Sequence, residues 1–235
     1  MLTIDLHIHS IASGHALNTV YELAYVAKTK GLTHIGIAEH GPSMQGAPHD
    51  GYFWISDQLI TLFGINIYLG IEANIIDKNG KLDLGNELLK KQKIVLAGIH
   101  EKTPYNQSDV DSNTESIINA MKNPFVKIIS HPWRPEFPVN IKEVVEASYE
   151  TETLLEINDN LFSRKKDLKE ILSHYSLLIK LCDKYKIPVI LGSDAHIAEK
   201  IGSDQNIMRI KHKIGLSDRI IINNKPELLF RRIRL

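Results

Sequence analysis

The fold of this chain is first indicated by the stretch Leu2-Thr3-Ile4-Asp5-Leu6-His7-Ile8-His9-Ser10. It begins as a short apolar run, about as long as a buried strand, and ends in two histidines two positions apart. Residues two apart face the same side of an extended chain, so His7 and His9 can bind one ion together. Asp5 shares that face and can orient a ligand histidine from behind.

Outward from this stretch, short runs rich in Ile, Val and Leu alternate with longer helical patterns. Runs typical of buried strands are Leu2–Leu6, His34–Ala38, Ile67–Ile71, Ile94–Ile99, Val126–Ser130, Leu154–Ile157 and Val189–Gly192. The predicted helices are Thr19–Lys30, Ile55–Phe63, Thr114–Lys122, Ile141–Thr151, Lys166–Tyr185 and the C-terminal Pro226–Leu235. This alternation predicts an α/β fold with a parallel sheet and crossover helices. Seven such units without a composition break predict one domain, residues 1–235, forming a closed or nearly closed barrel; the alternative is a doubly wound open sheet.

Composition argues against several classes of protein. Apolar residues make up 43% and charged residues 24% of the 235 positions, as in ordinary soluble domains. Lys plus Arg and Asp plus Glu each number 28, so no bulk charge draws the chain to nucleic acid or a membrane. The one cysteine, Cys182, allows no internal disulfide, and neither a secretory signal nor an apolar run long enough for a bilayer is evident. We expect a cytoplasmic protein.

The placement of the eleven histidines predicts the functional site. In a parallel α/β fold, working residues lie just beyond the carboxyl ends of the strands. A His, Asp or Glu stands at that end of six of the seven candidate strands: His7 and His9, Glu39-His40, Glu72, His100, His131, and Asp194 with His196. The spacing of Asp194 and His196 repeats that of His7 and His9. Imidazoles with one or two carboxylates suit zinc, and also manganese or iron.

These motifs resemble the PHP superfamily, named for polymerase and histidinol phosphatase. The resemblance rests on Asp-Leu-His-Ile-His-Ser at 5–10, Glu-His at 39–40, Ser-His-Pro at 130–132 and Gly-Ser-Asp-Ala-His at 192–196. It covers residues from Thr3 to about His196 and is greatest with the short, stand-alone bacterial branch that has a trinuclear zinc site. For that branch the resemblance implies a distorted seven-stranded (β/α) barrel of the TIM-like kind.

Carried over position by position, the resemblance implies a cluster of two to three metal ions. A first ion would be held by His7, His9, Glu72 and Asp194, a second by Glu72, His100 and His131, and a third by His15, His40 and His196. Glu72 would bridge the first two ions. His15 lies in a loop, with no strand to place it, so its assignment depends on the family.

Several other polar and aromatic residues lie near the same rim. Arg134 and Arg164 follow strand ends, and the planar guanidinium suits phosphate, although each could equally form a surface salt bridge. Asn158 and Asn160 lie at the same rim as Arg164, and Trp133 either lines the mouth of the site or packs in the core. We expect structural roles for His34, His174 and His212, whereas His49, near His40, is a weaker candidate for substrate contact.

The resemblance implies hydrolysis of phosphate esters, most simply small-molecule phosphomonoesters, by a metal-bound hydroxide. Glu72, Asp194, Arg134 and Arg164 are the predicted catalytic residues. One alternative is a 3′–5′ exonuclease or phosphodiesterase, whose basic groove the neutral charge argues against; another is a histidinol phosphate phosphatase. A non-catalytic metal-binding domain is disfavoured because the carboxylates Glu72 and Asp194 are present with all seven ligand histidines. An amidohydrolase is disfavoured because no bridging lysine is evident at the strand ends. A homo-oligomer is compatible with the family.

Overall fold

The computed structural model describes residues 2–55 and 59–235. Its sheet follows the order β1 (Ile4–Ile8), β2 (His34–His40), β4 (Ile65–Asn74), β5 (Ile94–Gly98), β6 (Ile128–Ile129), β7 (Leu154–Asn158) and β8 (Val189–Gly192). All neighbours on this path are parallel. At the seam, the N–H of His9 donates to the carbonyl of Ala195 at 2.9 Å. The seven parallel strands therefore form a nearly closed barrel, as predicted.

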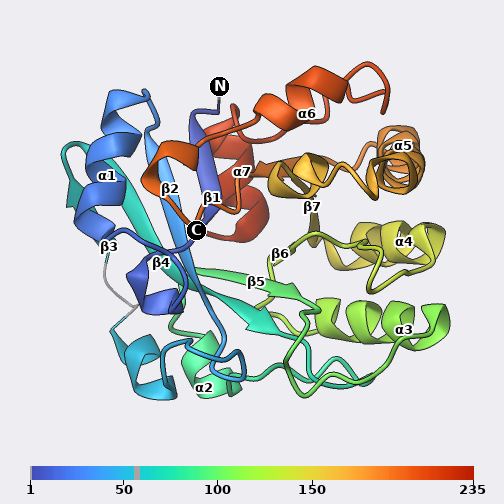
Figure 1. Cartoon of the computed structure of the whole chain (residues 1–235), viewed down its shortest axis with the longest axis horizontal. Helices are drawn as coiled ribbons and strands as arrows, with labels where there is room; N and C mark the ends of the chain where they lie inside the picture. Colours follow the sequence, from blue (N-terminus) through green and yellow to red (C-terminus); the bar gives the residue numbers. More distant parts are fainter. Residues whose placement is uncertain (1, 56–58) are drawn as a thin grey trace.

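Helices pack around this barrel, and the last of them packs against the apolar side chains of its interior. They are α1 (Val20–Thr29), α2 (Asn86–Leu89), α3 (Val110–Met121), α4 (Ile141–Thr151), α5 (Leu168–Tyr185), α6 (Gln205–Ile210) and α7 (Pro226–Ile233). Within the described residues, four short 3-10 turns follow strands: η1 (Ile11–Ser13), η2 (Asp50–Trp54), η3 (Asn160–Ser163) and η4 (Ala198–Lys200). Figure 1 shows α3, α4 and α5 stacked along one side and α1 on the other. Among the described helices, none combines the length and apolar character needed to cross a bilayer.

Local sequence explains where α1 begins and which face it buries. The Thr19 hydroxyl accepts from the backbone N–H of Glu22, and the Glu22 carboxylate accepts from the N–H of Thr19, which together form a capping box. The helix buries Leu23, Ala24 and Ala27, at the three- and four-residue spacing of one helical face. These residues pack on the outside of β1, β2 and β4.

The barrel interior is apolar at one end and polar at the other. Side chains that include Leu6, Leu96 and Ile190 pack together inside. Strand side chains alternate between two faces, so Glu72 lies on the same face of β4 as Tyr68, nearer the carboxyl end. The polar site therefore rests on a packed apolar layer inside the barrel.

One predicted helix, Ile55–Phe63, is wrong. Residues 56–58 of that segment lie outside the described residues, and Leu59–Leu62 forms strand β3, which pairs antiparallel with β4. Phe63 and Gly64 join the two strands with φ values of 54° and 81°. Positive φ at both positions of a two-residue loop is typical of the tight turns that fit a twisted hairpin. Pairing with β4 outweighs the helical pattern that the segment shows in isolation.

Candidate metal centre

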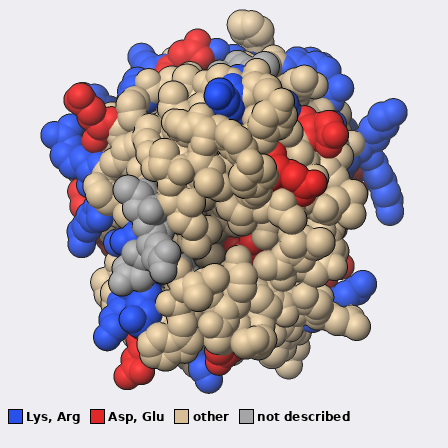
Figure 2. All heavy atoms as spheres, turned by 90° about the vertical axis from the view of Figure 1, so that its left-hand side faces the viewer, with Lys and Arg blue, Asp and Glu red and all other residues tan. Residues whose placement is uncertain are grey.

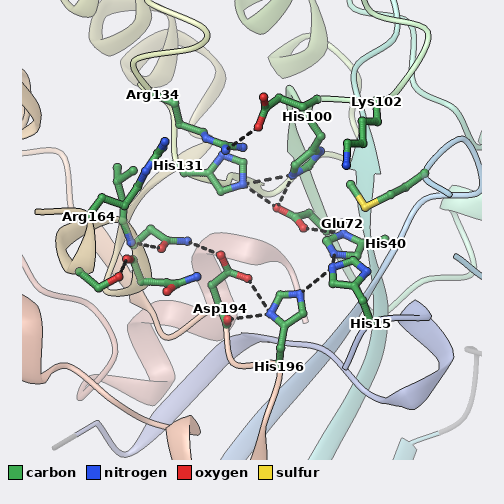
Figure 3. Close-up of a pocket in the computed structure, with 16 residues that line it drawn as sticks. His15, His40, Glu72, His100, Lys102, His131, Arg134, Arg164, Asp194 and His196 are labelled. Carbon is green, nitrogen blue, oxygen red and sulfur yellow. Dashed lines mark hydrogen bonds and ion pairs between the residues drawn. The ribbon is translucent and has the colours of Figure 1, made fainter. Parts of the chain in front are cut away.

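The structure brings together all nine predicted metal ligands at the carboxyl ends of the strands. They are His7, His9, His15, His40, Glu72, His100, His131, Asp194 and His196. Figure 3 shows the Glu72 carboxylate among the rings of His40, His100 and His131, with His15 and His196 beside them. Residues separated by up to 189 positions thus lie in one cluster, because the carboxyl ends of all the parallel strands lie at the same rim of the barrel.

Glu72 lies at the centre of the cluster and is buried. Its two oxygens lie 3.0–3.6 Å from ring nitrogens of five histidines: His7, His9, His40, His100 and His131. Oε1 faces His7, His100 and His131, whereas Oε2 faces His9 and His40. The carboxylate is therefore placed to offer one oxygen to each of two neighbouring cations.

Asp194 is the second carboxylate of the cluster. Its Oδ1 lies 3.7 Å from His7 Nε2, 3.4 Å from His9 Nε2 and 3.5 Å from His196 Nδ1. Asp194 has a φ of 52° and His131 a φ of 30°, values that are uncommon for residues other than glycine. Such backbone conformations gather at functional sites, where the surrounding structure holds them.

His15, His40 and His196 form the outer part of the cluster. The Nε2 of His15 lies 3.2 Å from that of His40 and 3.1 Å from that of His196. The loop that carries His15 turns at Gly14, whose φ is 82° and whose added Cβ would meet the Gly46 carbonyl oxygen at 2.1 Å. A glycine is thus required there to bring His15 over the barrel.

These spacings fit bound cations. Two ligand atoms of a tetrahedral zinc site with bonds of about 2.0–2.1 Å lie roughly 3.3 Å apart, close to the separations of 3.0–3.7 Å between side-chain atoms here. Among the described residues, the buried His7 Nε2, His9 Nε2 and His40 Nδ1 have no hydrogen-bond partner. Buried polar atoms are normally paired, so these nitrogens indicate a missing partner. The cluster therefore contains groups of side chains that can hold metal ions.

Glu156 orients one of the histidines, and sequence reasoning missed it. Its Oε1 lies 2.6 Å from His7 Nδ1, which leaves His7 Nε2 directed into the cluster. Its Oε2 accepts from the backbone N–H of His131 at 2.9 Å and from Asn158 Nδ2 at 3.0 Å. The available signal was a carboxylate inside the apolar strand Leu154–Ile157, where an unpaired charge would be costly.

Asp5 does not have the role that its spacing predicts. Its carboxylate accepts from the backbone N–H groups of His7 and Ser193, each at 3.3 Å, and of Gly202 at 2.8 Å. The β1–β2 register shifts between Asp5 and Ile8, so the strict two-residue alternation fails here. Asp5 therefore fixes the backbone of β1 and the loop after β8, and Glu156 contacts the His7 ring.

Ser13 and Glu39 support the other side of the cluster. The Ser13 hydroxyl lies 3.1 Å from His9 Nδ1 and accepts from the backbone N–H of His40 at 3.1 Å. The same hydroxyl donates to the buried carboxylate of Glu39, which also receives the Ser10 hydroxyl. One serine thereby fixes both the His9 ring and the backbone that carries His40.

The electrostatics of the cluster favour bound cations. Burial lowers the pKa of His9 well below its usual value and also lowers the pKa of His100, which favours the neutral imidazole that ligates a metal. Burial alone would raise the pKa of Glu72, but the neighbouring histidines, led by His7, hold it well below its usual value. The pKa of Asp194 is held low in the same way. Burial would lower the pKa of His7, but Glu156 and Glu72 raise it well above its usual value. Imidazoles around two carboxylates form a typical ligand set for divalent cations.

The cluster opens into a pocket of about 360 Å³. Arg134 and Arg164 line it, together with Asn158 and Asn160. Both arginines approach Glu136: Arg164 Nη1 donates to Oε2 at 3.0 Å, and Arg134 Nε lies 3.5 Å from the same oxygen. The hydrogen bonds from Arg164 lower the pKa of Glu136 to about 2. The candidate metal ligands therefore line one side of the pocket, and the paired charges of Arg134, Arg164 and Glu136 lie on another.

Further side chains line this pocket that sequence reasoning did not select, among them Leu161 and Ser163 of η3. Glu101 and Lys102 follow His100 on the turn after β5, and Met44 comes from the loop after β2. Neither the turn nor the loop has a periodic pattern, so only the folded chain shows that they reach the site.

The structure places the two residues with open roles away from the pocket. Trp133 is buried and stacks on His174 with ring centroids 3.9 Å apart, so its role is packing. His49 precedes η2 and accepts from the backbone N–H of Gly51 at 3.0 Å, as an N-terminal cap. His49 is not among the residues that line the pocket.

Comparisons with known proteins agree with this geometry. The family model described as "PHP domain" matches residues 5–175, and one described as "PHP-associated" matches residues 176–207. A protein named "probable phosphatase" from Clostridium novyi is 38% identical over 229 residues, which cover 96% of this chain and 92% of that protein. Another of that name from Syntrophotalea carbinolica is 37% identical over 228 residues, 95% and 92% of the two chains.

Two solved structures share the fold. A histidinol phosphate phosphatase from Lactococcus lactis, complexed with zinc, L-histidinol and phosphate, has a TM-score of 0.62 at 19% identity, covering 91% of this chain and 92% of that one. A chain of an archaeal ribonuclease P with mature tRNA has a TM-score of 0.60 at 14% identity, covering 99% and 92%. The family model and the phosphatase relatives span most of the chain, and its strand ends carry the histidine cluster. The chain therefore belongs to the PHP-domain family and is a phosphatase-type hydrolase.

Proposed function

We propose that this protein hydrolyses small-molecule phosphomonoesters at a centre of two to three divalent metal ions, with zinc as the first choice and manganese or iron as alternatives. The observation that carries the proposal is the convergence of seven histidines and two carboxylates, with neighbouring ligand atoms at distances that a bound metal allows, beneath a pocket of about 360 Å³. Such a pocket lies near the lower end of the range for small-molecule sites.

The distances support three groups of ligands. The proposed sets are His7, His9, Glu72 and Asp194 for the first ion, Glu72, His100 and His131 for the second, and His15, His40 and His196 for the third. In the second set, for example, His100 Nε2 and His131 Nε2 lie 3.2 Å apart and 3.1 and 3.0 Å from the same oxygen of Glu72. Bound divalent cations would lower the pKa of water toward neutrality and offset the charge of a phosphate group.

The protein's own groups bind and orient around this centre. Glu156 and Ser13 fix the rings of His7 and His9, and Asp194 and Glu72 supply the negative charge that draws cations. In the pocket wall, Arg134 and Arg164 hold guanidinium groups beside the space above the cluster, where they can stabilise charge on phosphate oxygens. We assign the arginines to phosphate and transition-state binding.

Surface charge favours a small substrate over a nucleic acid. The chain has equal numbers of acidic and basic residues. On the face in Figure 2, Lys and Arg side chains are scattered, mostly near the margins, with acidic side chains among them. A polymer substrate requires a continuous basic groove, and the described residues on this face do not form one. The zinc-containing histidinol phosphate phosphatase of similar fold supports a small phosphate monoester as the substrate.

We also propose that residues 1–235 act as one unit, because the boundary between the two matched family regions falls inside α5.

The first experiment measures metal content and hydrolysis of 4-nitrophenyl phosphate before and after chelation. We expect two to three metals per chain, activity lost to chelator, and recovery with zinc or manganese. A reconstituted protein with less than one metal per chain would refute the metal centre. A metal-loaded protein that cleaves diesters or oligonucleotides but no monoester would instead establish the nuclease alternative.

A further inference from the structure

The charges on one wall of the pocket are already compensated within the protein. Arg164 donates two hydrogen bonds to Glu136 and lies 3.4 Å from Asp167. Arg134 lies 3.5 Å from Glu136 and 3.8 Å from Glu101. Two guanidinium groups thus face three carboxylates, so this wall has no unpaired cation to spare for a second anionic group beyond the phosphate that the arginines are proposed to contact.

Lys102 differs from both arginines. It lines the same pocket, yet no carboxylate among the described residues pairs with it. Figure 3 shows its side chain directed toward the histidine cluster, on the side of the pocket opposite Arg164. An exposed lysine is usually a solvated surface charge, but this one is an uncompensated cation inside the wall of a concave site.

The backbone holds Lys102 in this position. Its φ is 61°, a left-handed conformation that few non-glycine residues adopt. The turn is tied to the metal site because the Thr103 hydroxyl donates to the His100 carbonyl at 2.8 Å. Since Glu101 on the same turn lies toward Arg134, the turn separates its two charges and leaves Lys102 for the opposite side of the pocket.

We infer that Lys102 is a specificity-determining residue that selects phosphomonoesters carrying a second anionic group, either a carboxylate or a second phosphate. This inference rests on the proposed function, in which the metal centre and the arginines meet the charge of the phosphate to be cleaved. The compact lysine ammonium pairs with either anion, whereas a bidentate site would require arginine. A substrate with only one anionic group would leave Lys102 unpaired.

Binding of non-hydrolysable ligands tests this inference separately from turnover. The metal-loaded full chain would be titrated calorimetrically, at low ionic strength, with propylphosphonate, 3-phosphonopropionate and propane-1,3-bisphosphonate. We expect at least one doubly functional ligand to bind about ten-fold more tightly than propylphosphonate, as a charge-assisted contact allows. Whichever of the two binds more tightly identifies the second group as carboxylate or phosphate.

Three variants distinguish a specific role of Lys102 from a general effect of surface charge. K102M should reduce the preference to about two-fold or less, and K102R should restore part of it. K180M, which removes an exposed lysine on the outer helix α5, should retain the full preference. Equal binding of all three ligands by the unmodified protein, or an unchanged preference in K102M, would overturn the inference. Hydrolysis of 4-nitrophenyl phosphate by the same samples reports on the proposed function alone.

Discussion

At the scale of single residues, the site depends on carboxylates buried inside the barrel. Glu72 and Glu156 are each only 1% exposed, and an isolated charge would be costly there. Glu72 is offset by histidines on several sides, and Glu156 by the His7 ring and a backbone N–H. Glu156 acts through His7, so its removal should weaken metal binding without removing a ligand.

Glu156→Gln should therefore lower metal affinity by about 10- to 100-fold, the usual effect of removing a group that orients a ligand histidine. Metal competition with a chelating dye measures this. Glu115→Gln, on the exposed face of α3, is the matched control and should bind metal like the unmodified chain. Unchanged affinity in Glu156→Gln would mean that His7 needs no orienting partner.

The pair between Arg164 and Glu136 predicts a pH dependence of stability. The Glu136 pKa falls from 4.5 to about 2 on folding, so its stabilising contribution is complete above about pH 4.5 and is lost as the pH falls toward 2. Glu136→Gln should cost up to about 1 kcal/mol at pH 7, because the pair is partly exposed. Urea unfolding of metal-free protein should show that difference shrinking between pH 5 and pH 3. A constant difference over this range would contradict the assignment.

At the scale of elements, the β3–β4 hairpin depends on a turn whose conformation its residues must tolerate. Gly64 has a φ of 81°, and an added Cβ would have nothing within 4 Å. The cost of a side chain there is therefore backbone strain and not a clash. This distinction makes the turn a clean test of the corrected assignment of the segment.

Gly64→Ala should destabilise the protein by about 1 kcal/mol, since alanine disfavours the left-handed region. Gly64→Asn should cost less, because asparagine tolerates that conformation. Both are measured by chemical unfolding monitored by circular dichroism. Equal losses in the two variants would indicate that the turn does not hold this φ in solution.

At the scale of the whole molecule, α7 joins the end of the chain to the apolar interior of the barrel. Leu229 and Ile233 are buried and belong to the same cluster as Leu6 of β1 and Ile190 of β8. The helix therefore ties the first and last parallel strands together near the seam. Asn223, just before α7, adds hydrogen bonds to the carbonyls of Ile4 at 3.0 Å and Leu191 at 2.7 Å.

Leu229→Ala should lower the free energy of unfolding by about 2–5 kcal/mol, because it opens a cavity in a packed interior. The neighbouring Leu228 is 39% exposed, and Leu228→Ala should cost under about 0.5 kcal/mol. Urea denaturation of both variants gives the comparison. Similar losses at the two positions would show that α7 does not pack as described.

The sequence by itself determined the seven parallel strands and the set of side chains at their carboxyl ends. Both depend on local patterns, because an apolar run indicates a buried strand and the residues directly after that run lie at the rim of the barrel. His15 was the exception, since its loop has no periodicity and only the family resemblance selected it.

Only the tertiary structure decided which side chains orient the candidate metal ligands and which further residues line the pocket above them. The histidine partner is Glu156 and not Asp5, because an irregular register in β1 breaks the expected alternation. Leu59–Leu62 forms a strand because β4 offers a pairing edge, and Lys102 reaches the pocket through a left-handed turn. Each of these depends on contacts between separate strands or on a local backbone conformation, and neither leaves a periodic signal in the sequence.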